Sequence, residues 1–110
     1  YFEEFDFCIR AKKKKINIGF LNGTKILHKV GKSSTSSIKL YFRTRNKLLF
    51  YHKHGSALAF FIAFTVHVII SIKRIVFSKN DKGKLIKAFL FGFKDYYNEH
   101  FYRGSIENIK

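Results

Sequence analysis

Residues 57–72 read ALAFFIAFTVHVIISI, and only Thr65, His67 and Ser71 interrupt this apolar run. A helix needs about 20 apolar residues to cross the hydrocarbon core of a bilayer, so the run is short for that purpose. Lys73 and Arg74 follow it directly, and Lys53 precedes it. We therefore expect a helix that lies on a membrane or packs against the rest of the protein, with anionic lipid reinforcing the contact. A small membrane protein with one spanning helix at residues 57–77 is the alternative.

Amphipathic helical patterns continue on both sides of this run. Apolar residues and intervening Arg and Lys residues predict a helix from Ile38 onward. Residues 84–102 carry an aromatic stripe with lysines around it, and they predict a final helix. Residues 3–14 predict a short first helix, because its first turn is acidic and its last turn is basic, as the helix dipole favours.

Between the first two helices, the sequence predicts a small β-hairpin. Its strands are Ile16–Leu21 and Thr24–Val30, and Asn22-Gly23 is a strong turn signal because both residues tolerate positive φ. A glycine- and serine-rich loop follows at residues 31–37. A phosphate-binding P-loop is excluded there, because Ile26 occupies the position of its first glycine.

The chain has 110 residues and a formal net charge of +15. This excess favours an anionic partner, which could be nucleic acid, anionic lipid or a phosphorylated ligand. A nucleic-acid binder is a rival interpretation, but the apolar run has no role in one and no recognised binding motif is present, so we expect no nucleic-acid partner. Cys8 is the single cysteine, which excludes an internal disulfide.

Chemically, the most informative feature is the acidic cluster Glu3-Glu4-Phe5-Asp6, which Arg10 follows. Three carboxylates within four residues repel one another unless a cation, a metal or a substrate hydroxyl compensates them. Such a cluster can hold a general base. The alternative is an ordinary acidic helix start in which Asp6 pairs with Arg10 at i, i+4. His28, at the end of the second predicted strand, could ligate a metal or donate to a phosphate.

Several of these motifs together resemble family 2 glycosyltransferases, especially rhamnosyltransferase-like members. Residues 3–10 look like the Glu-Asp-x-Asp-x-x-x-Arg motif of that family, with Glu4 where Asp is usual. His28 and the glycine- and serine-rich loop after it have the family's order and spacing, and so does the Arg45-Asn46 pair after Tyr41-Phe42. Gly92-Phe93-Lys94-Asp95 resembles a segment that closes the family pattern.

The resemblance implies an inverting transfer of a sugar from a nucleotide-diphosphate sugar to a hydroxyl of a glycan or lipid-linked acceptor, in surface polysaccharide synthesis. It implies Glu4 as general base, with Asp6 beside it and Arg10 as a supporting substrate-binding residue. His28 would bind a divalent metal, Mg or Mn, or the donor diphosphate. Ser33, Ser34, Arg45 and Asn46 would bind the substrate.

The same resemblance predicts an α/β parent with a Rossmann-like nucleotide-binding fold, of which this chain is a C-terminal fragment. The fragment itself would be mainly α-helical with the short hairpin near its start. Residues 1–37 would be the rim of the catalytic domain, and residues 38–110 a helical, membrane-associated extension. We expect it at the cytoplasmic face of the cell membrane, peripheral or monotopic, and inactive without a donor-binding half.

Overall fold

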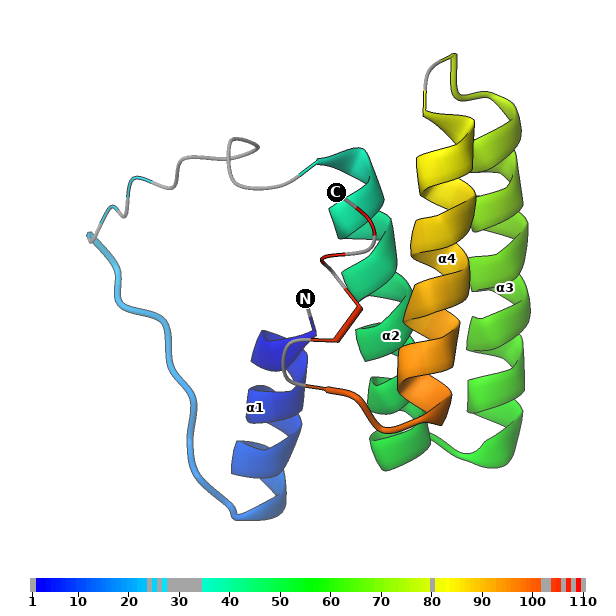
Figure 1. Ribbon diagram of the computed structural model, residues 1–110. Coiled ribbons are helices and arrows are strands. Elements are labelled where there is room, and N and C mark those ends of the chain that lie inside the picture. Colours follow the sequence, from blue (N-terminus) through cyan, green and yellow to red (C-terminus); the bar gives the residue numbers. More distant parts are fainter. Residues whose placement is uncertain are drawn as a thin grey trace.

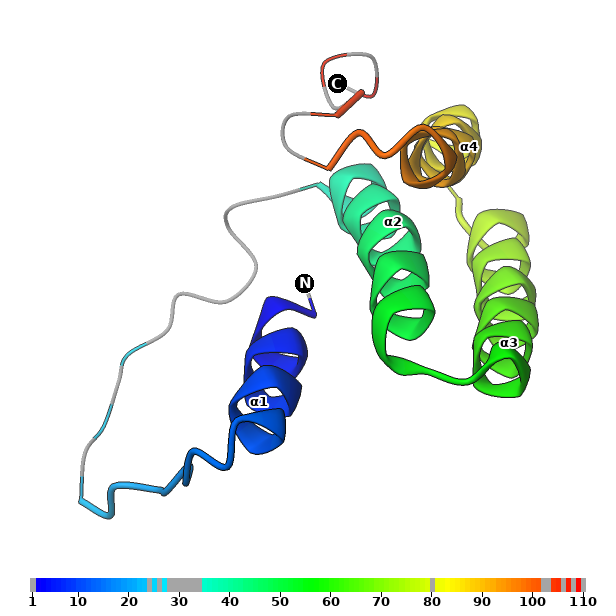
Figure 2. The same ribbon diagram turned by 90° about the horizontal axis from the view of Figure 1, so that it is seen from below.

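The computed structural model describes residues 2–23, 25, 27, 35–79, 81–101, 104, 105, 107 and 109. Within them the chain forms four helices, α1 (Glu3–Lys13), α2 (Ser36–His54), α3 (Ala57–Val76) and α4 (Lys82–Tyr97). Helices α2, α3 and α4 lie together as a bundle, and α1 lies beside α2 (Figures 1 and 2). Residues that follow α4 return past α2 toward α1 (Figure 1).

The closest packing in the bundle is between α2 and α4. A Cβ atom at Gly92 would lie 2.8 Å from the carbonyl oxygen of Tyr41 and 2.9 Å from Cβ of Thr44, so the two helices meet where α4 has no side chain. Ala88, one turn earlier on α4, is also fully buried. The core around this contact consists of Leu40, Tyr41, Leu85, Ala88 and Ile109. Small residues on one helix thus let large ones on the other fill the interface.

Helices α2 and α3 are joined by Gly55 and Ser56 only. The Ser56 hydroxyl group accepts a hydrogen bond from the backbone N–H of Ala59, and Thr35 caps the start of α2 in the same way through Ile38. Helix α3 runs past the predicted end of the apolar run to Val76, because Lys73 and Arg74 occupy its last turn. Positive charge is favourable at that end of a helix.

The predicted β-hairpin and the α/β fold are wrong for this chain. Residues 16–23, 25 and 27 contain no strand, and neither does any other part of the chain that the structure describes. Ile18, Phe20 and Leu21 are 53%, 101% and 86% exposed, so they have no surface to pack against. An isolated two-stranded hairpin is marginal in water without such a surface. The turn itself is present, with Gly23 at a φ of 88°.

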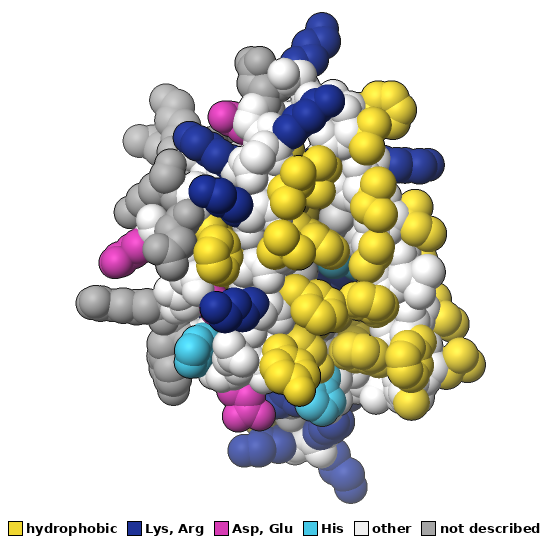
Figure 3. Space-filling view, turned by 45° about the vertical axis from the view of Figure 1, so that its right-hand side comes forward, with side chains coloured by type: hydrophobic (Ala, Val, Ile, Leu, Met, Phe, Trp, Pro, Cys, Tyr) yellow, Lys and Arg dark blue, Asp and Glu magenta, His cyan; other side chains and the backbone are white. Residues whose placement is uncertain are grey.

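Helices α3 and α4 together carry a broad apolar surface (Figure 3). We call it the α3–α4 apolar face, and its exposed side chains are Leu58, Phe61, Ile62, Val66, Ile69, Ile72, Val76, Ile86, Leu90, Phe93 and Tyr97. Only a few side chains of α3 point into the protein, among them His67 and Ser71. By length and composition, α3 is also able to cross a membrane, and most of it is not covered by the protein.

Candidate functional site

Asp6 on α1 is bound to α2 at its C-terminal end. Its Oδ1 atom accepts hydrogen bonds from Nε2 of His54 at 2.7 Å and from Nζ of Lys53 at 2.9 Å. Its Oδ2 atom accepts one from Nε of Arg10 at 2.8 Å, which confirms the predicted i, i+4 pair within α1. Asp6 therefore joins two segments that are far apart in the sequence.

This environment favours the ionised form of Asp6. The hydrogen bond from His54 and then that from Lys53 hold the pKa of Asp6 well below its usual range. A carboxylate with such a low pKa is a weak base. Asp6 is suited to hold α1 in place and to accept hydrogen bonds, and it is poorly suited to remove a proton.

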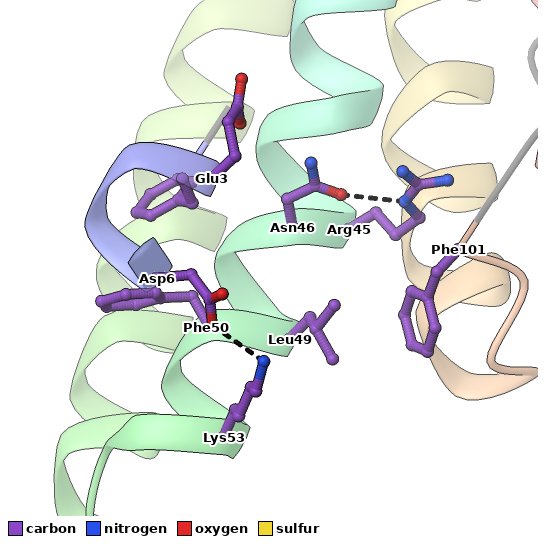
Figure 4. A pocket seen from close by; sticks show the side chains of 9 residues that line it. Glu3, Asp6, Arg45, Asn46, Leu49, Phe50, Lys53 and Phe101 are labelled. Carbon is purple, nitrogen blue, oxygen red and sulfur yellow. Dashed lines mark hydrogen bonds and ion pairs between the residues drawn. The ribbon is translucent and has the colours of Figure 1, made fainter. Parts of the chain in front are cut away.

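A cavity of about 240 Å³ lies between α1 and α2 beside Asp6. We call it the α1–α2 cavity. Figure 4 shows Glu3 and Asp6 on one side of it and Arg45, Asn46 and Lys53 on the other. The rings of Phe2, Phe50 and Phe101 line it as well, together with Leu49. Three of the predicted site residues, Asp6, Arg45 and Asn46, are thus brought to one cavity, although 39 positions separate Asp6 from Arg45.

Arg45 is largely occupied by contacts within the protein. Its Nε atom donates to Oδ1 of Asn46 at 2.9 Å, and its Nη1 atom donates to the hydroxyl oxygen of Tyr41 and to the carbonyl oxygen of His100. Its guanidinium group also lies 5.1 Å from the ring centre of Phe42. Because only 4% of Arg45 is exposed, it forms the inner wall of the cavity in a fixed orientation.

Behind Arg45, a buried carboxylate connects α2 and α4. The Tyr41 hydroxyl group donates to Oδ2 of Asp95 at 2.5 Å, and Ser105 donates to Asp95 through its backbone N–H and its hydroxyl group. Burial raises the pKa of Asp95, but the hydrogen bonds from Tyr41 and Ser105 outweigh it, and the pKa lies below its ordinary value. Gly104, at a φ of 58°, permits the turn that brings Ser105 to Asp95.

Glu4, the predicted general base, faces away from the α1–α2 cavity. It lines a second and larger cavity, of about 420 Å³, between α1, α2 and α3. Three cationic side chains line this cavity, Arg43 and Lys47 from α2 and Arg74 from α3. We call it the basic cavity. Apolar walls and two buried polar side chains complete it, through Phe2, Phe5, Leu40, His67, Ile70 and Ser71.

His67 marks the inner end of the basic cavity. The hydroxyl group of Thr44 donates to the carbonyl oxygen of Leu40, so the Nε2 atom of His67, 2.9 Å from that hydroxyl oxygen, must be the donor of their shared hydrogen bond. Burial, together with the positive charges of Lys47 and Arg43, lowers the pKa of His67 to about 4. His67 is therefore neutral at pH 7.

Three predicted site residues, His28, Ser33 and Ser34, lie outside the described residues. The described part of the chain holds no group of three or more His, Cys, Asp or Glu side chains able to bind a metal ion. The residues around Asp6 do not fit a divalent metal, because both carboxylate oxygens already accept hydrogen bonds from cationic or imidazole groups. The predicted metal remains a prediction that concerns His28.

Sequence reasoning did not assign the partners of Asp6 on α2, the partners of Asp95 or the cations of the basic cavity. In the sequence, Lys53 is notable only as a cation that precedes the apolar run, and nothing in the spacing of Lys53 and His54 connects them to Asp6. Arg43 and Lys47 are four positions apart and therefore share a face of α2. That spacing was the one available signal for the basic cavity.

Comparison with known proteins adds no relative. No family model, no curated protein sequence and no solved structure matches the chain.

Proposed function

We propose that this chain forms the acceptor side of a family 2 glycosyltransferase site and that the α1–α2 cavity binds a sugar. The observation that carries the proposal is the meeting of Asp6, Arg45 and Asn46 at one cavity. Carboxylate, guanidinium and amide groups together can donate to and accept from the hydroxyl groups of a sugar. The phenylalanine rings that line the same cavity offer flat apolar surfaces to the C–H faces of a sugar ring.

The roles of the residues follow from their contacts. Asp6 holds α1 against α2 and accepts hydrogen bonds, while Arg45, fixed by Tyr41 and His100, shapes the opposite wall. Glu4, the general base that the resemblance implies, faces away from the α1–α2 cavity, so the carboxylate proposed to act as the base on a sugar bound there is that of Glu3, which lines this cavity. The nucleotide-diphosphate sugar is proposed to bind to protein outside these 110 residues.

Measurement of sugar transfer tests this proposal. The complete open reading frame that contains the sequence would be expressed, and release of nucleoside diphosphate from a panel of nucleotide sugars would be followed. General-base catalysis contributes about 100-fold or more, so Glu3→Gln should lower the turnover rate at least to that extent. Glu4→Gln is the matched control, because it removes a carboxylate one position away that faces the other cavity, and it should retain most activity. Absence of transfer from every donor, or equal loss in both variants, would overturn the proposal.

Nuclear magnetic resonance of the 110-residue chain tests the cavity separately from the reaction. Titration with simple sugars should shift the backbone amide signals of residues 45, 46, 49 and 50 before those of α4. Shifts confined to the α3–α4 apolar face would contradict a sugar site in the α1–α2 cavity.

We further propose that the chain binds an anionic membrane through the α3–α4 apolar face, as a peripheral protein at the cytoplasmic side. The face is broad and exposed, and basic residues at its edges complement anionic lipid, namely Lys73, Arg74, Lys84, Lys87 and Lys94. A helix lying in the interface buries one apolar face and keeps its charged residues in water. Carbonate extraction of membranes should release the protein, whereas retention in the pellet would indicate that α3 spans the bilayer.

A further inference from the structure

The basic cavity between α1, α2 and α3 concentrates positive charge around an accessible space. Three cationic groups, those of Arg43, Lys47 and Arg74, line it against the single carboxylate of Glu4. Its volume, about 420 Å³, is large enough for a small ligand. Excess charge of one sign in a cleft attracts an ion of the opposite sign.

The pKa values of two groups that line the cavity reflect its burial and its positive charge. Burial lowers the pKa of Lys47, which means that its charged form is less stable in the cavity than in water. After burial, the charges of Lys47 and Arg43 are the causes that lower the pKa of His67. A bound anion would relieve both effects, because it would compensate the charge that Lys47 and Arg43 place beside His67.

The polar groups of the inner wall already have hydrogen-bond partners within the protein, so they do not bind the anion themselves. The Ser71 hydroxyl group donates to the carbonyl oxygen of His67, and the Nε2 atom of His67 donates to Thr44. The ammonium group of Lys47 and the guanidinium group of Arg74, which line the same cavity, can therefore provide hydrogen-bond donors to a ligand. Several donors on cationic groups around one space are the usual arrangement for recognising phosphate.

The apolar part of the lining indicates what the phosphate is attached to. Ile70 of α3 lines the basic cavity and is 57% exposed. Phe5, from α1, lies on the opposite wall and is also largely exposed. The cavity thus opens beside apolar surface, which suits a phosphate ester that carries a hydrocarbon group.

We propose that the basic cavity between α1, α2 and α3 binds a phosphate ester, with Lys47 and Arg74 as its principal ligands. This inference goes beyond the proposed transfer reaction and does not depend on it, since binding is measured without a donor sugar. The phosphate group can come from a membrane lipid that is a phosphate monoester, such as phosphatidic acid, or from a soluble monoester, and both sources present the same phosphate oxygens to the cavity.

The test compares two double variants of the 110-residue chain. Lys47→Gln with Arg74→Gln removes two charges from the basic cavity, and Lys12→Gln with Lys13→Gln removes two from the last turn of α1, outside the lining of the cavity. Circular dichroism verifies that both variants retain their helices. Inorganic phosphate and glycerol phosphate are titrated by calorimetry. Vesicles of phosphatidylcholine with phosphatidic acid are compared with vesicles that carry the same charge as fatty-acid carboxylate.

The cavity variant should bind phosphate about tenfold or more weakly than the parent, because it has lost two charge-assisted hydrogen bonds to the phosphate group. The α1 variant should lose less than about twofold, as expected for distant exposed charges. Binding to phosphatidic acid but not to the soluble phosphates assigns a lipid source, and binding to both assigns the phosphate group alone. Equal losses in the two variants, equal binding to phosphate and carboxylate vesicles, or no binding at all would overturn the proposal.

Discussion

The hydroxyl group of Tyr41 on α2 donates a hydrogen bond of 2.5 Å to the carboxylate of Asp95 on α4, and both side chains are inaccessible to solvent. Arg45, which lines the α1–α2 cavity, donates to Tyr41, and Ser105 donates to Asp95. The pair therefore connects the wall of that cavity to the segment that follows α4. Two helices and the segment after α4 thus depend on one buried carboxylate. A buried charge that loses a partner is costly, so this pair controls the stability of the fold.

Asp95→Ala should lower the free energy of unfolding by about 2–4 kcal/mol, because Tyr41 and Ser105 lose their acceptor inside the protein. Tyr41→Phe should cost less, about 1–2 kcal/mol, since Ser105 continues to donate to Asp95. Tyr97→Phe is the control, because Tyr97 is 81% exposed, and it should change stability little. Urea denaturation followed by circular dichroism measures all three, and similar losses in the two tyrosine variants would contradict the assignment.

Gly92→Ala should destabilise the bundle by about 1–3 kcal/mol, because the added methyl group would meet the carbonyl oxygen of Tyr41 and the side chain of Thr44. Gly83→Ala, on the same helix, is the matched control. Its Cβ atom would meet nothing within 4 Å, and alanine favours a helix over glycine, so this variant should be neutral or slightly more stable. Thermal denaturation distinguishes them, and a stable Gly92→Ala variant would mean that α2 and α4 are not in such close contact.

Stability should fall as the pH decreases from about 6.5 to 4, because His67 stays neutral in the folded chain while it gains a proton in the unfolded chain. The pKa of His67 is about 4 in the folded chain against 6.5 for an unperturbed histidine, and this difference amounts to up to about 3 kcal/mol of stability across this range. His67→Gln should remove most of this slope. His100→Gln, whose side chain is 66% exposed, should leave the slope unchanged.

Asp95 and Asp6 act in a lower pH range than His67. Their pKa values are lowered in the folded chain, so the stability that they contribute is present above about pH 4 and is lost as the pH falls below it. Urea denaturation at closely spaced pH values separates the two ranges. A single transition below pH 4, with no slope between 6.5 and 4, would show that His67 is accessible to water.

Asp6→Asn should release α1 without unfolding the bundle, because the charge that attracts His54, Lys53 and Arg10 is removed. Amide hydrogen exchange should become faster at residues 6–13 and stay unchanged in the middle of α2 and α4. Glu99→Gln removes an exposed charge elsewhere and serves as the control. Unchanged exchange in α1 would mean that the phenylalanine contacts of Phe2 and Phe5 with Phe50 hold the helix by themselves.

The helices could be predicted from the sequence because their signals are local. Periodic apolar residues and the charges near the ends locate the start of each helix within two positions, and the Asp6–Arg10 pair follows from helical spacing. The hairpin failed because a strand needs a partner surface, which no local pattern reveals. Likewise, Tyr41 and Asp95 are 54 positions apart and Asp6 and His54 are 48 apart, so these contacts depend on how the helices pack.

Binding to anionic vesicles should depend on the centre of the α3–α4 apolar face. Phe61→Ser with Ile69→Ser removes two exposed apolar side chains from α3, and burial of each contributes about 1.5–3 kcal/mol, so vesicle affinity should fall more than tenfold. Ile16→Ser with Ile18→Ser is the matched control, because those residues are similarly exposed but lie away from α3 and α4. Sedimentation with phosphatidylglycerol vesicles measures both variants. Equal losses would show that charge and general hydrophobicity, rather than this face, determine binding, and undiminished binding of the α3 variant would exclude the face as the membrane contact.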